Sequence, residues 1–319
     1  MRIAFVGKGG SGKTTLSALF TEHLKKDNKP MLVFDADLNI HLPVLLGFND
    51  LIPVEKHLSY PATVKKIKQY LKGSNEIANL AAFRKTTPPT QKSNLISLSD
   101  LENSVLKDFY IKKDNLHLAI VGTYGEEQIG ASCYHNNLAI FENVLSHLVD
   151  TDGYVVADMV AGVDAFANTL HAQFDMLCLI VEPTKRSVEV FEHYRRLATE
   201  AGTENGLMVV ANKIRSEKDK EFIRQNIPHD KFIGFIEESP YLREIEQEGG
   251  SLDIDLLEEN NRKLLDLIKD RLMAQPQDLQ KRLENLWDLH KVYVAQDSIK
   301  ERFGDLTNQI DISFSYDAK

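Results

Sequence analysis

The sequence is poor in cysteine and contains no long hydrophobic run. Cys133 and Cys178 are the only cysteines in 319 residues, which excludes a disulfide scaffold as the basis of the fold. No apolar run approaches the roughly 20 residues that a membrane-spanning helix requires. The chain runs from Met1 directly into an apolar strand pattern, so no signal peptide is predicted. These features predict a soluble cytoplasmic protein that has no membrane partner.

The chain also lacks an excess of positive charge. It carries 38 Lys and Arg against 47 Asp and Glu, a formal net charge of −9 at pH 7. Non-specific binding to nucleic acid needs a basic surface, so we expect no nucleic-acid partner. The hydrophobic share of 43% and the charged share of 27% are ordinary for a globular protein. A chain of this length buries a substantial core.

What the sequence does contain is a phosphate-binding loop. Residues 1–15 read MRIAFVGKGGSGKTT: an apolar strand pattern, a glycine-rich turn and the start of a helical pattern. Glycines allow backbone N–H groups to turn toward phosphates, and the helix directs the positive end of its dipole at the same anion. Lys13 is predicted to reach the β- and γ-phosphates, and Thr14 to ligate Mg²⁺. The predicted phosphate contacts are Gly9, Gly10, Ser11, Gly12, Lys13, Thr14 and Thr15. The alternative is a glycine-rich turn without a ligand.

Apolar runs alternate with helical patterns along most of the chain, which predicts a doubly wound α/β fold. The sheet is expected to have about seven mostly parallel strands, with helices on both faces. The predicted strands are Arg2–Val6, Met31–Phe34, Leu116–Val121, Tyr154–Ala157, Met176–Val181, Leu207–Val210 and Phe232–Phe235.

Composition divides the chain into three parts. Residues 1–254 are predicted to form the ATPase domain of a phosphate-loop protein, with an inserted, mostly helical, lid-like segment at 48–115. Helical segments near Ala62–Leu71 and Asn75–Phe83 and a short strand at Leu95–Leu98 are expected within the insertion. Residues 255–319 are predicted to form a helical C-terminal extension, in which the alternating pattern of Gln309–Tyr316 fits a terminal strand.

Acidic residues follow two of the predicted strands. Asp35 and Asp37 lie two residues apart, so only one of them faces the phosphates; Asp35 is expected either at the metal or capping the turn. Asp158 begins a D-x-x-x-G segment that ends at Gly162. Asp158 is predicted to hold Mg²⁺ through water, and the Gly162 N–H to sense the γ-phosphate. The alternative is a set of strand-end residues that only form turns.

Two further positions fit recognition of the nucleotide base. Asn212 and Lys213 follow a predicted strand, and an asparagine amide both donates to and accepts from an adenine edge. Arg215 stands where a guanine-reading protein would have aspartate, which favours ATP. Pro240 follows the last predicted strand, where it either flanks the base or only begins a helix.

The loop K-G-G-x-G-K-T-T at residues 8–15 resembles the variant phosphate loop of the MinD/ParA/nitrogenase-iron-protein group of ATPases. The resemblance implies that Lys8 crosses a dimer interface to the partner's nucleotide. It also implies that Asp37, the second residue of the D-x-D pair, orients the attacking water. The catalytic residues expected from it are Asp37, Lys13 and Lys8.

From Met1 to about Asp253 the chain resembles CooC-type maturation ATPases of carbon monoxide dehydrogenase. The segments that carry the resemblance are GKGGSGKTT, FDADLN, ADMVAGVDAF, LIVEPTKRSVEV, VVANKI and FIGFIEESP. It implies a homodimer that forms on ATP binding and serves a client metalloenzyme. That family binds metal through a C-x-C pair, and this chain has Cys133-Tyr134-His135 at the matching place. Cys133 and His135 of two subunits are therefore candidate ligands of a shared Zn²⁺ or Ni²⁺, the alternative being a buried thiol beside a histidine that leads a helix.

Three functions remain open from the sequence. A metallocentre or cofactor maturation ATPase is the favoured hypothesis. A positioning or partition ATPase acting through protein partners is the alternative, although the acidic C-terminus lacks the basic amphipathic pattern of a membrane-binding version. An iron–sulfur reductase would need two loop cysteines per subunit around a shared cluster, and Cys133 alone qualifies.

Overall fold

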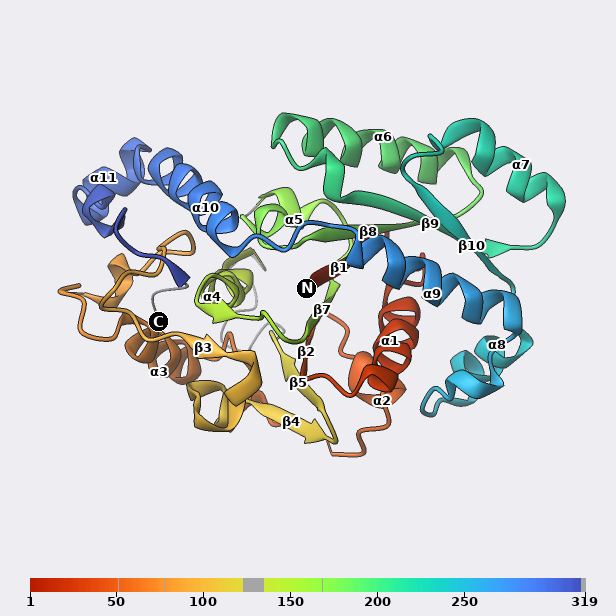
Figure 1. The fold of residues 1–319 in the computed structure, drawn as a ribbon, viewed down its shortest axis with the longest axis horizontal. Coiled ribbons are helices and arrows are strands. Elements are labelled where there is room, and N and C mark those ends of the chain that lie inside the picture. Colours follow the sequence, from red (N-terminus) through yellow and green to blue (C-terminus); the bar gives the residue numbers. More distant parts are fainter. Residues whose placement is uncertain (51, 78, 123–134, 168, 317–319) are drawn as a thin grey trace.

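The computed structural model describes residues 1–50, 52–77, 79–122, 135–167 and 169–316. Its centre is an eight-stranded sheet with the strand order β10-β9-β8-β1-β7-β2-β5-β4 (Figure 1). All neighbouring pairs are parallel except β4 and β5. A separate two-stranded sheet pairs β3 with β6. The strands are β1 Arg2–Gly7, β2 Met31–Ala36, β3 Ile96–Ser97, β4 Tyr110–Lys113, β5 Leu116–Ile120, β6 Leu148–Val149, β7 Tyr154–Met159, β8 Met176–Val181, β9 Leu207–Ile214 and β10 Phe232–Glu237.

Helices cover both faces of the large sheet, which confirms the doubly wound α/β prediction (Figure 1). In β1, Ala4 and Val6 pack into the core of one face, while Ile3 and Phe5 pack into the other, as the two-residue period of a strand requires. The helices are α1 Lys13–Leu24, α2 Leu42–Leu45, α3 Pro61–Lys72, α4 His135–Ser146, α5 Asp164–Ala167, α6 Lys185–Glu200, α7 Glu217–Asn226, α8 Pro240–Glu248, α9 Glu259–Met273, α10 Leu279–Val294 and α11 Asp297–Phe303.

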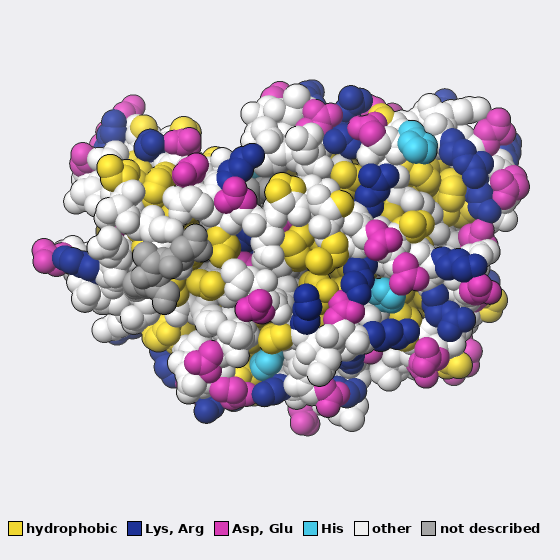
Figure 2. Space-filling view, viewed as in Figure 1, with side chains coloured by type: hydrophobic (Ala, Val, Ile, Leu, Met, Phe, Trp, Pro, Cys, Tyr) yellow, Lys and Arg dark blue, Asp and Glu magenta, His cyan; other side chains and the backbone are white. Residues whose placement is uncertain are grey.

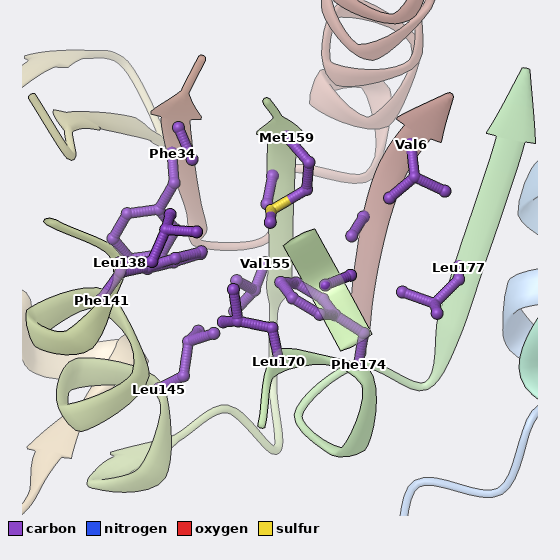
Figure 3. Close-up of a cluster of buried hydrophobic side chains, with 14 of the residues drawn as sticks. Val6, Phe34, Leu138, Phe141, Leu145, Val155, Met159, Leu170, Phe174 and Leu177 are labelled. Carbon is purple, nitrogen blue, oxygen red and sulfur yellow. The ribbon is translucent and has the colours of Figure 1, made fainter. Parts of the chain in front are cut away.

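Each face has its own apolar core. On one face α4 packs on β2 and β7, and the rings of Phe34 and Phe141 lie 4.6 Å apart (Figure 3). On the other face, α1 contributes Leu19 and Phe20, and α9 contributes Leu265 and Ile268. Helix α9 belongs to the predicted extension, so the extension begins as part of the core of the sheet.

The expected sheet of about seven strands is present, with one strand in addition to those predicted, whereas the expected terminal strand is absent. Within the described residues the large sheet has eight strands. The additional strand, β4, lies at the edge and is half-exposed, so its sequence YIKK lacks the apolar run that marks the buried strands. Gln309–Tyr316 forms no terminal strand: a 3₁₀ turn at Thr307–Gln309 is followed by an irregular segment. The Asp311 carboxylate accepts from the backbone N–H groups of Ser313 and Gln91, which replaces strand pairing with a local turn.

The inserted segment and the end of the chain pack against each other (Figure 1). The expected helix near Ala62–Leu71 is present as α3, and the expected strand is shortened to β3. The second expected helix, near Asn75–Phe83, is reduced to a 3₁₀ turn at Leu80–Ala82. The Arg84 guanidinium stacks on Phe303 at 4.6 Å and donates to Tyr293 Oη at 2.9 Å. A Thr86–His290 hydrogen bond of 2.8 Å joins the same two parts.

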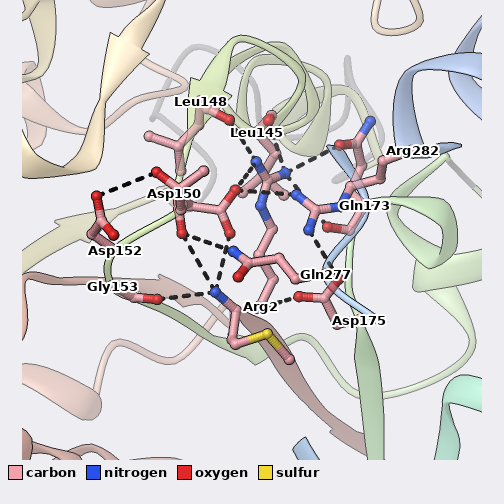
Figure 4. A network of polar contacts seen from close by, with 12 residues as sticks. Arg2, Leu145, Leu148, Asp150, Asp152, Gly153, Gln173, Asp175, Gln277 and Arg282 are labelled. Carbon is pink, nitrogen blue, oxygen red and sulfur yellow. Dashed lines mark hydrogen bonds and ion pairs between the residues drawn. The ribbon is translucent and has the colours of Figure 1, made fainter. Parts of the chain in front are cut away.

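A buried charge cluster lies at the amino end of β1 (Figure 4). Asp150 is fully buried and accepts from the guanidinium groups of Arg2 and Arg282, at 2.8 and 3.1 Å. The terminal amine of Met1 lies 3.3 Å from the same carboxylate. A second carboxylate, Asp175, accepts from the Arg2 backbone N–H and from the Arg282 guanidinium. Because Arg282 belongs to α10, this cluster fastens the C-terminal extension to the sheet.

Among the helices that the structure describes, none combines the length and the apolarity needed to cross a membrane. On the face shown in Figure 2, basic and acidic side chains are interspersed over the described surface.

Candidate functional site

The phosphate loop leaves β1 at Gly7 and enters α1 at Lys13, so its setting between strand and helix is confirmed. Gly7 has φ 146°, and a Cβ there would stand 2.7 Å from the Ile180 carbonyl oxygen of β8. Gly12 has φ 94°, and a Cβ there would stand 2.1 Å from the Asn212 amide nitrogen of β9. The glycines are therefore required both by backbone conformation and by the neighbouring strand ends.

Lys13, Thr14 and Asp158 meet beside this loop. The Lys13 ammonium donates to the Lys8 carbonyl oxygen at 3.1 Å. Thr14 Oγ1 donates to one carboxylate oxygen of Asp158 at 2.6 Å, while the other Asp158 oxygen is buried and has no partner among the described residues. Burial raises the pKa of Asp158 to about 7, against the opposing effects of Thr14 and Lys13. A hydroxyl and a carboxylate with an unpartnered oxygen are the hard oxygen donors that Mg²⁺ takes in proteins, so these residues fit that ion.

The two aspartates at the end of β2 do different things. Asp35 is fully buried, directly beside Asp158 in the register of β2 and β7. Its carboxylate accepts from the backbone N–H groups of Asp37 and Leu42, at 3.2 and 3.1 Å. Of the two roles expected for Asp35, these contacts are those of a turn cap. Burial, with the Asp158 charge as the next cause, raises the pKa of Asp35 well above its ordinary value. Asp37 is half-buried and accepts from the Asn39 backbone N–H.

Gly162 connects the segment after Asp158 to the phosphate loop. Its backbone N–H donates to the Gly7 carbonyl oxygen at 3.2 Å, and its carbonyl accepts from the Tyr194 hydroxyl of α6. Gly162 has φ 112°, in the region that favours glycine. The Gly162 N–H, the predicted donor to the γ-phosphate, is thus hydrogen-bonded to the residue at which the loop begins.

Asn212 and Lys213 both contact the phosphate loop. The Asn212 side-chain amide donates to the Ser11 carbonyl oxygen at 2.8 Å, and the Lys213 ammonium donates to the Gly10 carbonyl oxygen at 2.7 Å. Lys213 also pairs with Glu182 at 2.9 Å, and Lys8 pairs with the same carboxylate. The Asn212 amide therefore supports the loop, rather than standing free for a base.

A pocket of about 320 Å³ opens beside the loop, between α1 and the end of β10. Thr15 and Asn212 line it, as does Arg215, and its floor includes the apolar Leu16 and Ile236. Pro240 is the first residue of α8 and is not among the lining residues that the structure describes; its neighbour Ser239 is. A pocket with an apolar floor and a polar rim beside a phosphate loop suits a nucleoside.

The proposed metal ligands lie at the boundary of what the structure describes. Cys133 falls outside the described residues, and His135 is described only as the first residue of α4. Within the described ranges, no group of three or more His, Cys, Asp and Glu side chains is arranged to hold a metal ion. Cys178 is a buried free thiol inside β8, where burial raises its pKa well above the ordinary value.

Glu182 was not among the residues predicted from the sequence. It follows β8, carries a side chain 14% exposed, and binds both Lys8 and Lys213. The available signal was an acidic residue directly after a buried strand, the same signal that marked Asp35 and Asp158. The sequence alone does not place Glu182 at the loop, because its position there follows from β8 lying between β9 and β1 in the sheet.

Comparisons with known proteins show the family and the fold of the chain. The family model of the CobQ/CobB/MinD/ParA nucleotide binding domain matches residues 3–252. An uncharacterized ATP-binding protein of Methanocaldococcus jannaschii is 26% identical over 250 residues, 77% of this chain and 87% of that protein. The carbon monoxide dehydrogenase accessory protein CooC of Rhodospirillum rubrum is 25% identical over 250 residues, 78% of this chain and 88% of that protein. The cell division ATPase MinD of Pyrococcus furiosus shares the fold, with a TM-score of 0.52, 18% identity, and coverage of 84% of this chain and 98% of that one.

Proposed function

This chain belongs to the CobQ/CobB/MinD/ParA nucleotide-binding family, and we propose that it is a Mg²⁺-dependent ATPase that forms a homodimer on binding ATP. The observation that carries the proposal is the Thr14–Asp158 pair beside a glycine loop, with a buried Asp158 oxygen that no described residue contacts through a hydrogen bond. Residues 1–254 form the proposed ATPase domain, and 255–319 brace it through α9 and Arg282.

In this proposal the loop N–H groups of Gly9–Thr15 bind the phosphates, and Lys13 leaves the Lys8 carbonyl to reach the β- and γ-phosphates. Thr14 and Asp158 would hold Mg²⁺, which neutralises phosphate charge when bound. Asp35 acts through the turn that it caps and so positions Asp37. Asp37 orients the attacking water and accepts its proton, and the Gly162 N–H exchanges the Gly7 carbonyl for the γ-phosphate. The pocket beside Asn212 and Lys213 receives the base.

The work coupled to ATP hydrolysis is proposed to be maturation of a metallocentre in a client protein. The support is similarity in sequence to an accessory protein of carbon monoxide dehydrogenase. Positioning or partition through protein partners is the alternative; the likeness to MinD is a likeness of fold.

A comparison of two variants tests the ATPase proposal. Asp37→Asn should keep Mg²⁺-ATP binding by calorimetry and lower the hydrolysis rate by about 10²- to 10⁴-fold, the range for loss of a general base. Lys13→Ala should weaken binding itself. ATP-dependent dimerisation is followed by size-exclusion chromatography with light scattering. The proposal fails if the wild-type protein shows neither heat of nucleotide binding nor hydrolysis.

The metal hypothesis for Cys133 and His135 needs a separate measurement. Metal analysis of the ATP-bound dimer, loaded with Zn²⁺ or Ni²⁺ and desalted, should give about one ion per dimer, because two thiolates and two imidazoles complete one tetrahedral site. Cys133→Ser should lose the ion, whereas Cys178→Ser, a change in the core of β8, should keep it. Equal and negligible metal in wild type and Cys133→Ser would contradict the hypothesis.

A further inference from the structure

Three neighbouring strands bring an ion triad to the mouth of the phosphate loop. Lys8 follows β1, Glu182 follows β8, and Lys213 is the second-last residue of β9. The Glu182 carboxylate binds Lys8 through one oxygen and Lys213 through the other, the latter at 2.9 Å. Burial alone would raise the pKa of Glu182, but the hydrogen bonds from both lysines outweigh burial and lower it. The carboxylate is therefore charged, and it is shared between two cations.

The position of Glu182 is rigid, whereas Lys8 is only loosely enclosed. Glu182 is followed by Pro183, and Thr184 caps the amino end of α6, which fixes the backbone at this point. The side chains of Glu182 and Lys8 are 14% and 34% exposed. An ion pair with this exposure is weak, so another anion can replace Glu182 as the partner of Lys8.

Lys213 lowers the free-energy cost of exchanging the partner of Lys8, because it also binds Glu182. It has φ 60°, a left-handed conformation that is uncommon outside glycine and that turns the residue toward the loop. Its ammonium group contacts both Glu182 and the Gly10 carbonyl oxygen, at 2.9 and 2.7 Å. When Lys8 leaves, Glu182 keeps one cation and no unpaired carboxylate remains.

We propose that Glu182 is a positioning residue that retains Lys8 within its own subunit and releases it to the partner subunit's triphosphate when the ATP-bound dimer forms. This inference rests on the proposed function, because it requires that Lys8 crosses the dimer interface. Glu182 then opposes dimerisation until a phosphate of higher charge competes for Lys8. Lys213 holds Glu182 in place through both states, so the pair reforms after the dimer separates.

The test is Glu182→Gln, which keeps the shape and removes the charge. Dimerisation is measured by analytical ultracentrifugation with Mg²⁺ and AMPPNP, a non-hydrolysable nucleotide. Each released Lys8 is expected to contribute about two- to fivefold, the size of a partly exposed ion pair. Since a dimer releases two, its dissociation constant should fall by about 4- to 25-fold. Glu204→Gln, which removes a comparable ion pair with Arg195, is the matched control and should change nothing.

The same substitution in a Lys8→Ala background separates this role from a general effect of charge. With Lys8 absent, Glu182→Gln should no longer tighten the dimer. An equal tightening in both backgrounds, no tightening in either, or a loss of AMPPNP binding in Glu182→Gln would overturn the inference and leave the proposed function standing. A wild-type protein that binds nucleotide without dimerising would overturn both.

Discussion

At each end of β1, basic side chains share one carboxylate, but the cluster at the amino end is buried and the cluster at the carboxyl end is partly exposed. At the amino end, Arg2 and Arg282 converge on Asp150, and all three side chains are less than 10% exposed. At the carboxyl end, Lys8 and Lys213 converge on Glu182 and remain 34% and 45% exposed. Each end has two basic side chains on one shared carboxylate, and the amino end adds the Met1 amine and a second carboxylate, Asp175. The main difference between the two ends is therefore burial.

The amino-end cluster has no exchangeable partner. Burial alone would raise the pKa of Asp150, but the positive charges of Arg2, Arg282 and the terminal amine hold it well below its ordinary value. Removing Asp150 leaves the buried Arg2 guanidinium without a counter-charge, which is strongly unfavourable. The carboxyl-end triad can lose a member at little cost, since water or phosphate can take its place. A buried cluster of this kind fixes the fold, while a partly exposed one can serve a ligand.

The largest effect is expected at Asp150. Asp150→Asn should lower the free energy of unfolding by about 3–5 kcal/mol, because Arg2 and the Met1 amine lose their counter-charge inside the protein, while Arg282 keeps only Asp175. Denaturant unfolding followed by circular dichroism measures the change. Asp152→Asn is the matched control: Asp152 is two residues away and exposed, and its change should stay within about 0.5 kcal/mol. A loss below 1 kcal/mol at Asp150 would remove the structural role of the cluster.

A buried carboxylate without neighbouring arginines should have a raised pKa rather than a lowered one. Glu142 of α4 is fully buried, accepts from Thr169, and has one oxygen that lacks a partner in the part of the chain that the structure describes. Burial raises its pKa to about 7, with Thr169 and Lys85 opposing. The folded state then holds a proton that the unfolded state loses above about pH 4.5. Unfolding free energy therefore falls as pH rises from about 4.5 to about 7.

Glu142→Gln should remove this pH dependence. Relative to wild type, the variant should gain about 2 kcal/mol more stability at about pH 8 than at about pH 5. Unfolding curves at the two pH values give the difference. Glu142 would prove to be ionised in the folded protein if the gain were the same at both.

The smallest effect on stability is expected at Glu182. Glu182→Gln should change the free energy of unfolding by less than about 1 kcal/mol, and the change should shrink further in salt, as for other partly exposed ion pairs. Urea titrations at low and high ionic strength measure it. A loss as large as that of Asp150→Asn would show that both ends of β1 are structural, and the comparison would fail.

The sequence alone was sufficient for the fold class and for the phosphate loop. The seven parallel strands predicted from apolar runs are all present; apart from the partly buried edge strand β10, they are largely buried on both faces, which requires continuous apolar residues. Thr14 and Asp158 were both predicted to lie at one Mg²⁺ site, and their side chains are hydrogen-bonded, since parallel strands place their carboxyl ends at one edge of the sheet. The glycines of the loop carry information of the same local kind, namely backbone conformations that other residues avoid.

Only the tertiary structure decided which distant charges meet. Nothing local in the sequence joins Arg2 to Asp150 and Arg282, or Glu182 to Lys8 and Lys213. Edge strand β4 and the irregular segment after Gln309 escaped prediction for the same reason, since partner availability and not period set their conformation. Local sequence determines the preferred backbone conformation of each segment and which of its faces is buried. The contacts between remote side chains follow from strand order, which depends on the energy of packing the whole chain.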